Sequence, residues 1–73
     1  MYIVIETQKH NGKVQTFTSS YATKPEAESA FYEILTKAAV SDIDVHSATI
    51  LNERGFIEKC QNYIHNEDAV DEE

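Results

Sequence analysis

The sequence predicts an α+β fold of order ββαββ, in which one amphipathic helix lies on one face of a four-stranded, mainly antiparallel sheet. Two β-prone runs flank Asn11-Gly12, an apolar stripe with helical spacing follows over residues 24–40, and two further extended runs come after it. A chain of 73 residues is long enough for one small domain. We place that domain at residues 1–65.

The first two strands are expected at residues 2–8 and 13–20. Both runs are rich in β-branched and aromatic residues, and Asn11-Gly12 lies between them. Asn and Gly tolerate the positive φ angles that a tight hairpin turn requires, so this dipeptide is the strongest short-range hairpin signal in the chain.

A helix is expected over residues 24–40, beginning at a capping box. In Thr23-Lys24-Pro25-Glu26 the threonine hydroxyl can accept from the third helical amide while the glutamate reaches back, and proline suits a first turn. Glu33 and Lys37 have the spacing of a favourable ion pair on the solvent side. The apolar stripe at i, i+3, i+4 and i+7 consists of Ala27, Ala30, Phe31, Ile34, Leu35, Ala38 and Ala39.

Residues 45–52 and 56–63 predict a second hairpin. The polar turn Asn52-Glu53-Arg54-Gly55 joins them, with glycine where a left-handed conformation is needed. Residues 66–73 carry no apolar periodicity, so we expect them to form an acidic, disordered tail.

Apolar residues occur at both parities of the predicted strands, so both faces of the sheet are expected to need cover. The first strand shows the pattern, with Tyr2 and Val4 on one face and Ile3 and Ile5 on the other. One helix covers one face, and exposed apolar patches usually mark contacts. We therefore predict a homodimer, or a higher oligomer, through the helix-free face or a strand edge. The alternative is that the β-branched residues are present for their strand propensity and that the second face is partly exposed to solvent.

The formal net charge of −7 arises mainly at the end of the chain. Of 13 acidic residues, five lie in residues 67–73, which leaves eight acidic against six basic residues, a balance of −2, for residues 1–66. Direct nucleic-acid binding is not expected, because it needs a clustered positive surface. No signal peptide or membrane span is recognised, so the predicted location is the cytoplasm.

Residues that carry chemistry are scattered, and we predict neither an enzyme nor a metal or cofactor site. The three histidines lack the spacing of metal ligands, and the spacing supports no Ser-His-Asp arrangement. The lone Cys60 is expected to be a small buried hydrophobe, and it points to a reducing compartment. Asp42 and Asp44 are expected to form a solvated turn that ends the helix.

Polar aromatic residues are the expected lining of a binding surface. Tyr32 matters most, because it lies off the apolar stripe and should be partly exposed; its alternative role is packing over the hairpin ends. Tyrosine and arginine side chains can stack a nucleotide base and hold a phosphate. The candidate residues are Tyr2, Tyr21, Tyr32, His46, Arg54 and Tyr63.

Four stretches carry a resemblance to other proteins: AESAFY (27–32), LTKAAVS (35–41), VHSA (45–48) and LNERGF (51–56). In this order they resemble a group of small uncharacterised ββαββ proteins carried by gut Gram-positive bacteria and their phages or integrated elements. The resemblance covers about residues 2–65, and its motifs are structural. It implies a phage or mobile-element accessory protein, a context in which small acidic proteins are often inhibitors of host defence, as anti-CRISPR proteins are.

Two functions are predicted as alternatives. The first is a non-enzymatic binding protein that acts through protein–protein contacts and offers its acidic surface and tail to a basic site on a host protein. The second is a module that binds or sequesters a small, nucleotide-like ligand in a pocket at a dimer interface.

Overall fold

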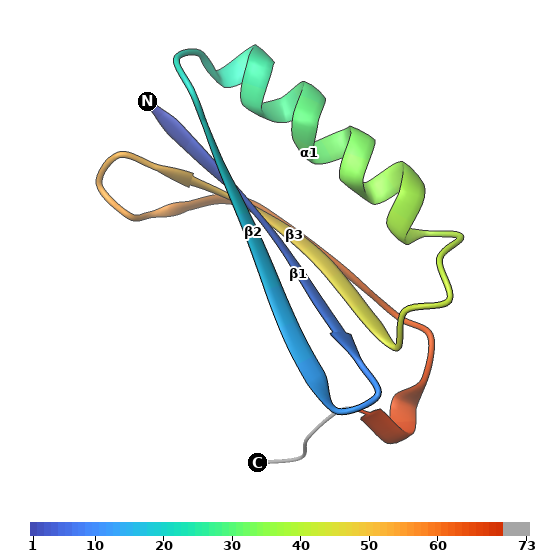
Figure 1. Ribbon diagram of the computed structural model, residues 1–73. Helices are drawn as coiled ribbons and strands as arrows, with labels where there is room; N and C mark the ends of the chain where they lie inside the picture. The colour runs from blue at the N-terminus through green and yellow to red at the C-terminus, as the bar shows by residue number, and fades with distance from the viewer. Residues whose placement is uncertain (70–73) are drawn as a thin grey trace.

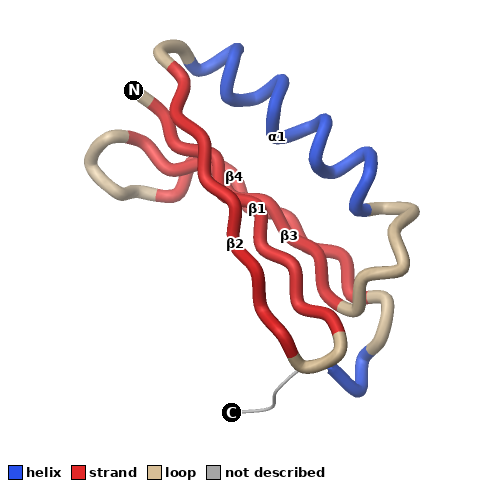
Figure 2. The backbone as a smooth tube through the Cα atoms, in the orientation of Figure 1, coloured by secondary structure: helices blue, strands red, loops and turns tan. Residues whose placement is uncertain are grey.

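The computed structural model describes residues 1–69 and has the predicted α+β fold, with a ββαββ order of its main elements. Helix α1 (Lys24–Ala38) lies across one face of a single antiparallel sheet, as Figure 1 shows. Figure 2 shows the same two layers, helix on one side and strands on the other. The sheet has the strand order β2-β1-β3-β4. Its strands are β1 (Tyr2–His10), β2 (Lys13–Tyr21), β3 (Val45–Asn52) and β4 (Ile57–Ile64).

Both predicted hairpin turns are confirmed. Asn11 and Gly12 have φ angles of 53° and 78°, and they form the two-residue turn between His10 and Lys13, which face each other in the register. In the second turn Gly55 has a φ of 85°, a region in which a side chain is disfavoured. Strand β1 extends two residues beyond its predicted end, because the short turn lets pairing continue up to it, and β2 extends by Tyr21, which pairs with Tyr2.

Thr23 caps the amino end of α1, as predicted, but the box closes differently. The Thr23 Oγ1 accepts a hydrogen bond from the Glu26 amide at 3.4 Å. The Glu26 carboxylate accepts from the Thr23 hydroxyl at 2.8 Å instead of reaching the Thr23 amide. The predicted Glu33–Lys37 ion pair forms at 3.6 Å on the exposed side of the helix.

Replacing the cap tests its contribution to stability. We expect Thr23→Ala to lower the free energy of unfolding by about 1 kcal/mol, because the amide of Glu26 loses its acceptor. Urea denaturation followed by circular dichroism measures the change. Ser29→Ala, on the exposed surface of the same helix, is the matched control and should leave stability unchanged or slightly higher. Equal losses in the two variants would show that the cap contributes nothing specific.

The core lies between α1 and the central strands. Its buried residues are Val4, Ala27, Phe31, Ala48 and Ile50. Ala27 on the helix and Ala48 on the sheet are completely buried. Small side chains on both layers let the helix backbone approach the sheet closely, so the predicted alanine-rich stripe is a packing surface.

A β-bulge between Ile50 and Leu51 shifts the register of β4. Tyr63 lies opposite His46 on the helix side, whereas Ile57 lies opposite Leu51 on the other face. Simple alternation along the chain would place Ile57 and Tyr63 on one face, and the extra residue in β4 reverses this.

The connection from α1 to β3 is less solvated than predicted. The Asp44 side chain is only 15% exposed, and its Oδ2 accepts a hydrogen bond from the Asn11 amide at 3.1 Å. Asp44 thus links the first hairpin turn to the end of the helix-to-strand connection that directly precedes β3. At the end of the chain, Glu67–Ala69 form one turn of 3-10 helix. The prediction of a disordered tail falls, for residues 70–73, outside the described residues.

Candidate interaction surface

The helix-free face is the side of the sheet that points away from α1. Val4, Ala48 and Ile50 pack under the helix, so their neighbours along β1 and β3 point the other way. Each of the four strands contributes four residues to this face, and residues that pair across the strands form a row, so the face is an array of four rows and sixteen positions. Seven of these positions are aliphatic: Ile3, Ile5, Val14, Val45, Leu51, Ile57 and Ile64.

The other positions of the helix-free face are mostly small hydroxyl residues. Lys9 is the one charged residue among the sixteen, and Cys60 and Asn62 complete the array. Val14 and Ile57 are 62% and 66% exposed, although both are aliphatic. The hydroxyl residues are Thr7, Thr16, Thr18, Ser20, Ser47 and Thr49. The predicted two-sided apolar pattern is therefore present in the folded chain, with one side uncovered.

Cys60 is exposed, contrary to the prediction of a buried hydrophobe. It lies on the edge strand β4, opposite Thr49, whose hydroxyl donates to its Sγ at 3.4 Å. The prediction rested on the usual burial of a lone cysteine on a strand, but Cys60 lies on the face of the sheet that α1 does not cover.

The six candidate polar residues do not form one surface. Tyr2 and Tyr21 face each other in the register of β1 and β2 and pack, partly buried, against the core. Arg54 lies in the exposed turn near the same end. His46 and Tyr63 face each other near the opposite end of β3 and β4. All of the candidates lie on the helix side of the sheet, on the helix or in a turn, so none belongs to the helix-free face.

Tyr32 is 48% exposed, as predicted, and it links α1 to the edge strand. Its hydroxyl accepts a hydrogen bond from the Lys59 Nζ at 2.6 Å, and the ammonium lies 5.1 Å from the centre of the ring. The Glu28 carboxylate pairs with the same ammonium at 3.2 Å. The Tyr32 hydroxyl and the Glu28 carboxylate together raise the pKa of Lys59 above its ordinary value. The exposed Tyr32 ring therefore already has a partner within the chain, the Lys59 ammonium.

The structure brings together three polar residues that sequence spacing did not connect. His46 is 3% exposed, and its Nε2 donates to the Glu6 Oε2 at 2.6 Å. The Ser41 Oγ lies 3.2 Å from the His46 Nδ1. Partial burial raises the pKa of Glu6, but hydrogen bonds from His46 and Gln8 outweigh it, so the pKa lies below its ordinary value. Only the pairing of β1 with β3 could reveal this contact, because Glu6 and His46 are 40 residues apart in the sequence.

The Ser41–His46–Glu6 chain has the connectivity of a catalytic triad but an unfavourable setting for nucleophilic chemistry. The Ser41 Oγ also bonds the Ala38 carbonyl at 3.2 Å, at the carboxyl end of α1. The His65 Nε2 bonds the same carbonyl at 2.7 Å. Carbonyl dipoles at this end oppose the negative charge that acyl transfer develops. These contacts instead hold the end of the helix against β3.

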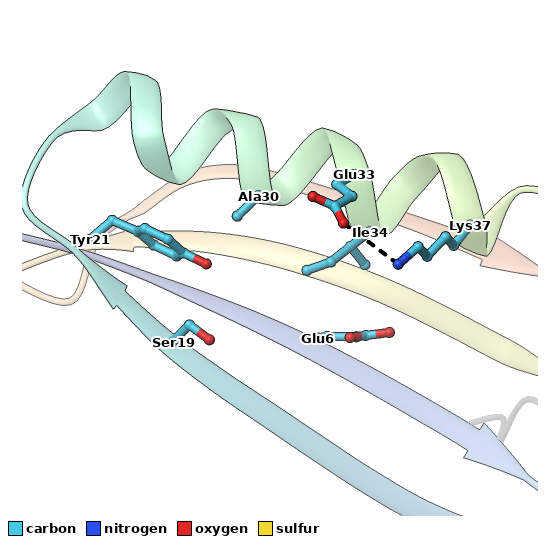
Figure 3. A pocket seen from close by; sticks show the side chains of 7 residues that line it. All are labelled: Glu6, Ser19, Tyr21, Ala30, Glu33, Ile34 and Lys37. Carbon is cyan, nitrogen blue, oxygen red and sulfur yellow. Dashed lines mark ion pairs between the residues drawn. The ribbon is translucent and has the colours of Figure 1, made fainter.

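A cavity of about 270 Å³ opens between α1 and β2. Figure 3 shows Tyr21 and Glu6 on its sheet side and Glu33 and Lys37 on its helix side. Its charged groups are paired within the chain, Lys37 with Glu33 at 3.6 Å and Glu6 with His46 at 2.6 Å. The cavity is smaller than the roughly 300–1,000 Å³ typical of small-molecule sites. A second cavity of about 310 Å³ lies beside the first hairpin turn, and neither cavity lies on the helix-free face.

Within residues 1–69, no three His, Cys, Asp or Glu side chains are grouped so that they could hold a metal ion. In the same part of the chain, no helix has the length and apolar character needed to cross a membrane. Comparisons with protein families, with curated proteins and with solved structures find no match for this chain. The resemblance to proteins of gut bacteria and their phages thus stays a prediction. The fold defines the class: a ββαββ protein with one sheet face covered by a helix and the other open.

Proposed function

We propose that this chain is a non-enzymatic binding protein whose helix-free face makes protein–protein contacts. The observation that carries the proposal is the composition of that face, in which seven of sixteen positions are aliphatic and one is charged. Aliphatic side chains that stay exposed together on one face usually mark a contact site, and the centres of protein interfaces are depleted in charge.

A protein partner suits this face better than other ligands do. Small-molecule sites are concave, whereas this face is the broad surface of a four-stranded sheet. Nucleic-acid binding requires several cations to neutralise phosphates, and Lys9 is the one cationic residue of the array. The two cavities lie elsewhere, and the carboxylates and the ammonium described for the first are paired within the chain.

Site-specific photo-crosslinking tests the proposal. The photoreactive residue p-benzoylphenylalanine is placed either at Thr18, on the helix-free face of β2, or at Gln15, on the other side of the same strand. Both positions are exposed, so each variant should fold. In cells of the organism that carries the gene, irradiation is expected to yield protein adducts from position 18 and few from position 15.

Mass spectrometry of the adducts identifies the bound protein. Adducts from position 18 alone support the proposal, whichever protein they contain. Equal labelling from the two positions, or no protein adduct from position 18, would overturn it.

A further inference from the structure

The size of the helix-free face matches the requirement of a stable interface. Four strands about 4.8 Å apart span roughly 19 Å, and eight residues at about 3.3 Å each span roughly 26 Å. The face therefore covers about 500 Å² in projection, and two such faces cover about 1,000 Å² before the relief of the side chains is added. A specific protein interface needs about 1,000 Å² in total.

The shape of the face favours a sheet as its occupant. An α-helix is about 10 Å in diameter, so it would cover roughly half of the width and leave aliphatic residues at one edge exposed. Val14 on β2 and Ile57 and Ile64 on β4 are exposed at the two edges of the sheet, so full cover needs an object four strands wide. Two sheets pack face to face about 10 Å apart, with strands within about 30° of alignment.

Resting on the proposed function, we infer that the occupant is a second copy of this chain, packed sheet against sheet as a two-fold β-sandwich. A second copy has the required width and the same low charge, so burial desolvates few ions on either side. Six of the seven aliphatic residues also lie in the first and last rows of the array, and five of the six hydroxyl residues lie in the two rows between them. Rows of one kind therefore meet rows of the same kind in the other copy.

Sedimentation equilibrium of the full chain, from micromolar to millimolar concentration, tests the second copy. The wild-type chain is expected to reach twice its mass of 8.3 kDa. Thr18→Glu places two carboxylates in the interface and should raise the dissociation constant by about 100-fold or more. Gln15→Glu adds the same charge on the other side of β2 and should raise it less than about threefold.

The outcomes separate this inference from the proposed function. A wild-type chain with a single-copy mass throughout the series, or dimers that Thr18→Glu leaves intact, would overturn the second copy. If the crosslinker at position 18 nevertheless captured a different protein, the proposed function would stand and only the identity of the partner would fall.

The Cys60 thiol gives a readout that needs no substitution. It is exposed on the helix-free face of a single chain, so its reaction rate with a maleimide should fall as the protein concentration rises and dimers form. A rate independent of concentration would contradict the sandwich.

Discussion

Phe31→Ala is expected to lower the free energy of unfolding by about 3–5 kcal/mol. Phe31 is 2% exposed and lies at the centre of the contact between α1 and the sheet, beside Val4 and Ile50. Truncation removes the apolar surface that it buries and leaves a cavity, because the alanine-rich packing around it holds the helix at its present distance and limits collapse.

The effect is large relative to the whole chain. At roughly 0.05–0.15 kcal/mol per residue, a protein of this size has about 4–11 kcal/mol of stability, so the substitution removes roughly a quarter or more. Urea unfolding at a fixed protein concentration measures it, since any association makes apparent stability depend on concentration. Tyr32→Ala, one residue along and 48% exposed, is the control and should cost about 1 kcal/mol for its lost hydrogen bond. A loss at position 31 no larger than at position 32 would contradict this account of the core.

Local sequence signals account for the elements that were predicted correctly. Asn11-Gly12 specifies its turn through backbone conformation alone, and Thr23 specifies the start of α1 through a bond to a residue three positions away. The alanine stripe has the helical period, so the face of the helix that packs on the sheet is visible without knowledge of the sheet. In each case the physical cause lies within a few residues of the pattern.

Features that depend on strand register could not be predicted in the same way. The bulge beside Leu51 moves Ile57 to the helix-free face, and no local residue pattern predicts this bulge. The Glu6–His46 contact requires β1 to lie beside β3, although β1 is joined in sequence to β2. The polar candidates were chosen by residue type, whereas the helix-free face is composed of ordinary β-branched residues, which serve strand propensity and interface equally well. In the sequence, the only indication of that face was therefore that apolar residues occur at both alternating positions along the strands.

Glu6→Gln is expected to destabilise the chain at pH 7 by about 1–3 kcal/mol and to flatten its response to acid. Glu6 accepts hydrogen bonds from the buried His46 and from Gln8, at 2.6 and 3.0 Å. Its amide replacement carries no charge and leaves the buried imidazole with a weaker acceptor. Lys37, whose positive charge also acts on Glu6, lies at the exposed side of the helix.

The direction of the pH effect follows from the lowered pKa of Glu6 in the folded chain. A carboxyl with a lower pKa when folded contributes stability that is fully present above its unfolded pKa of about 4.3. This contribution is lost as the pH falls through the folded value. The difference in unfolding free energy between wild type and Glu6→Gln should thus shrink from pH 5.5 toward pH 3.

Comparison with a second carboxylate isolates the role of Glu6. Glu33 pairs with Lys37 in solvent, where both side chains are at least 70% exposed, so Glu33→Gln should change stability by less than about 0.5 kcal/mol at any pH in the series. Glu58, whose pKa is lowered by Asn52 and Lys24, is present in all three proteins, so its contribution cancels in the comparison. A parallel acid response of wild type and Glu6→Gln would show that the buried pair contributes no pH-dependent stability, because its loss would then leave the proton linkage of folding unchanged.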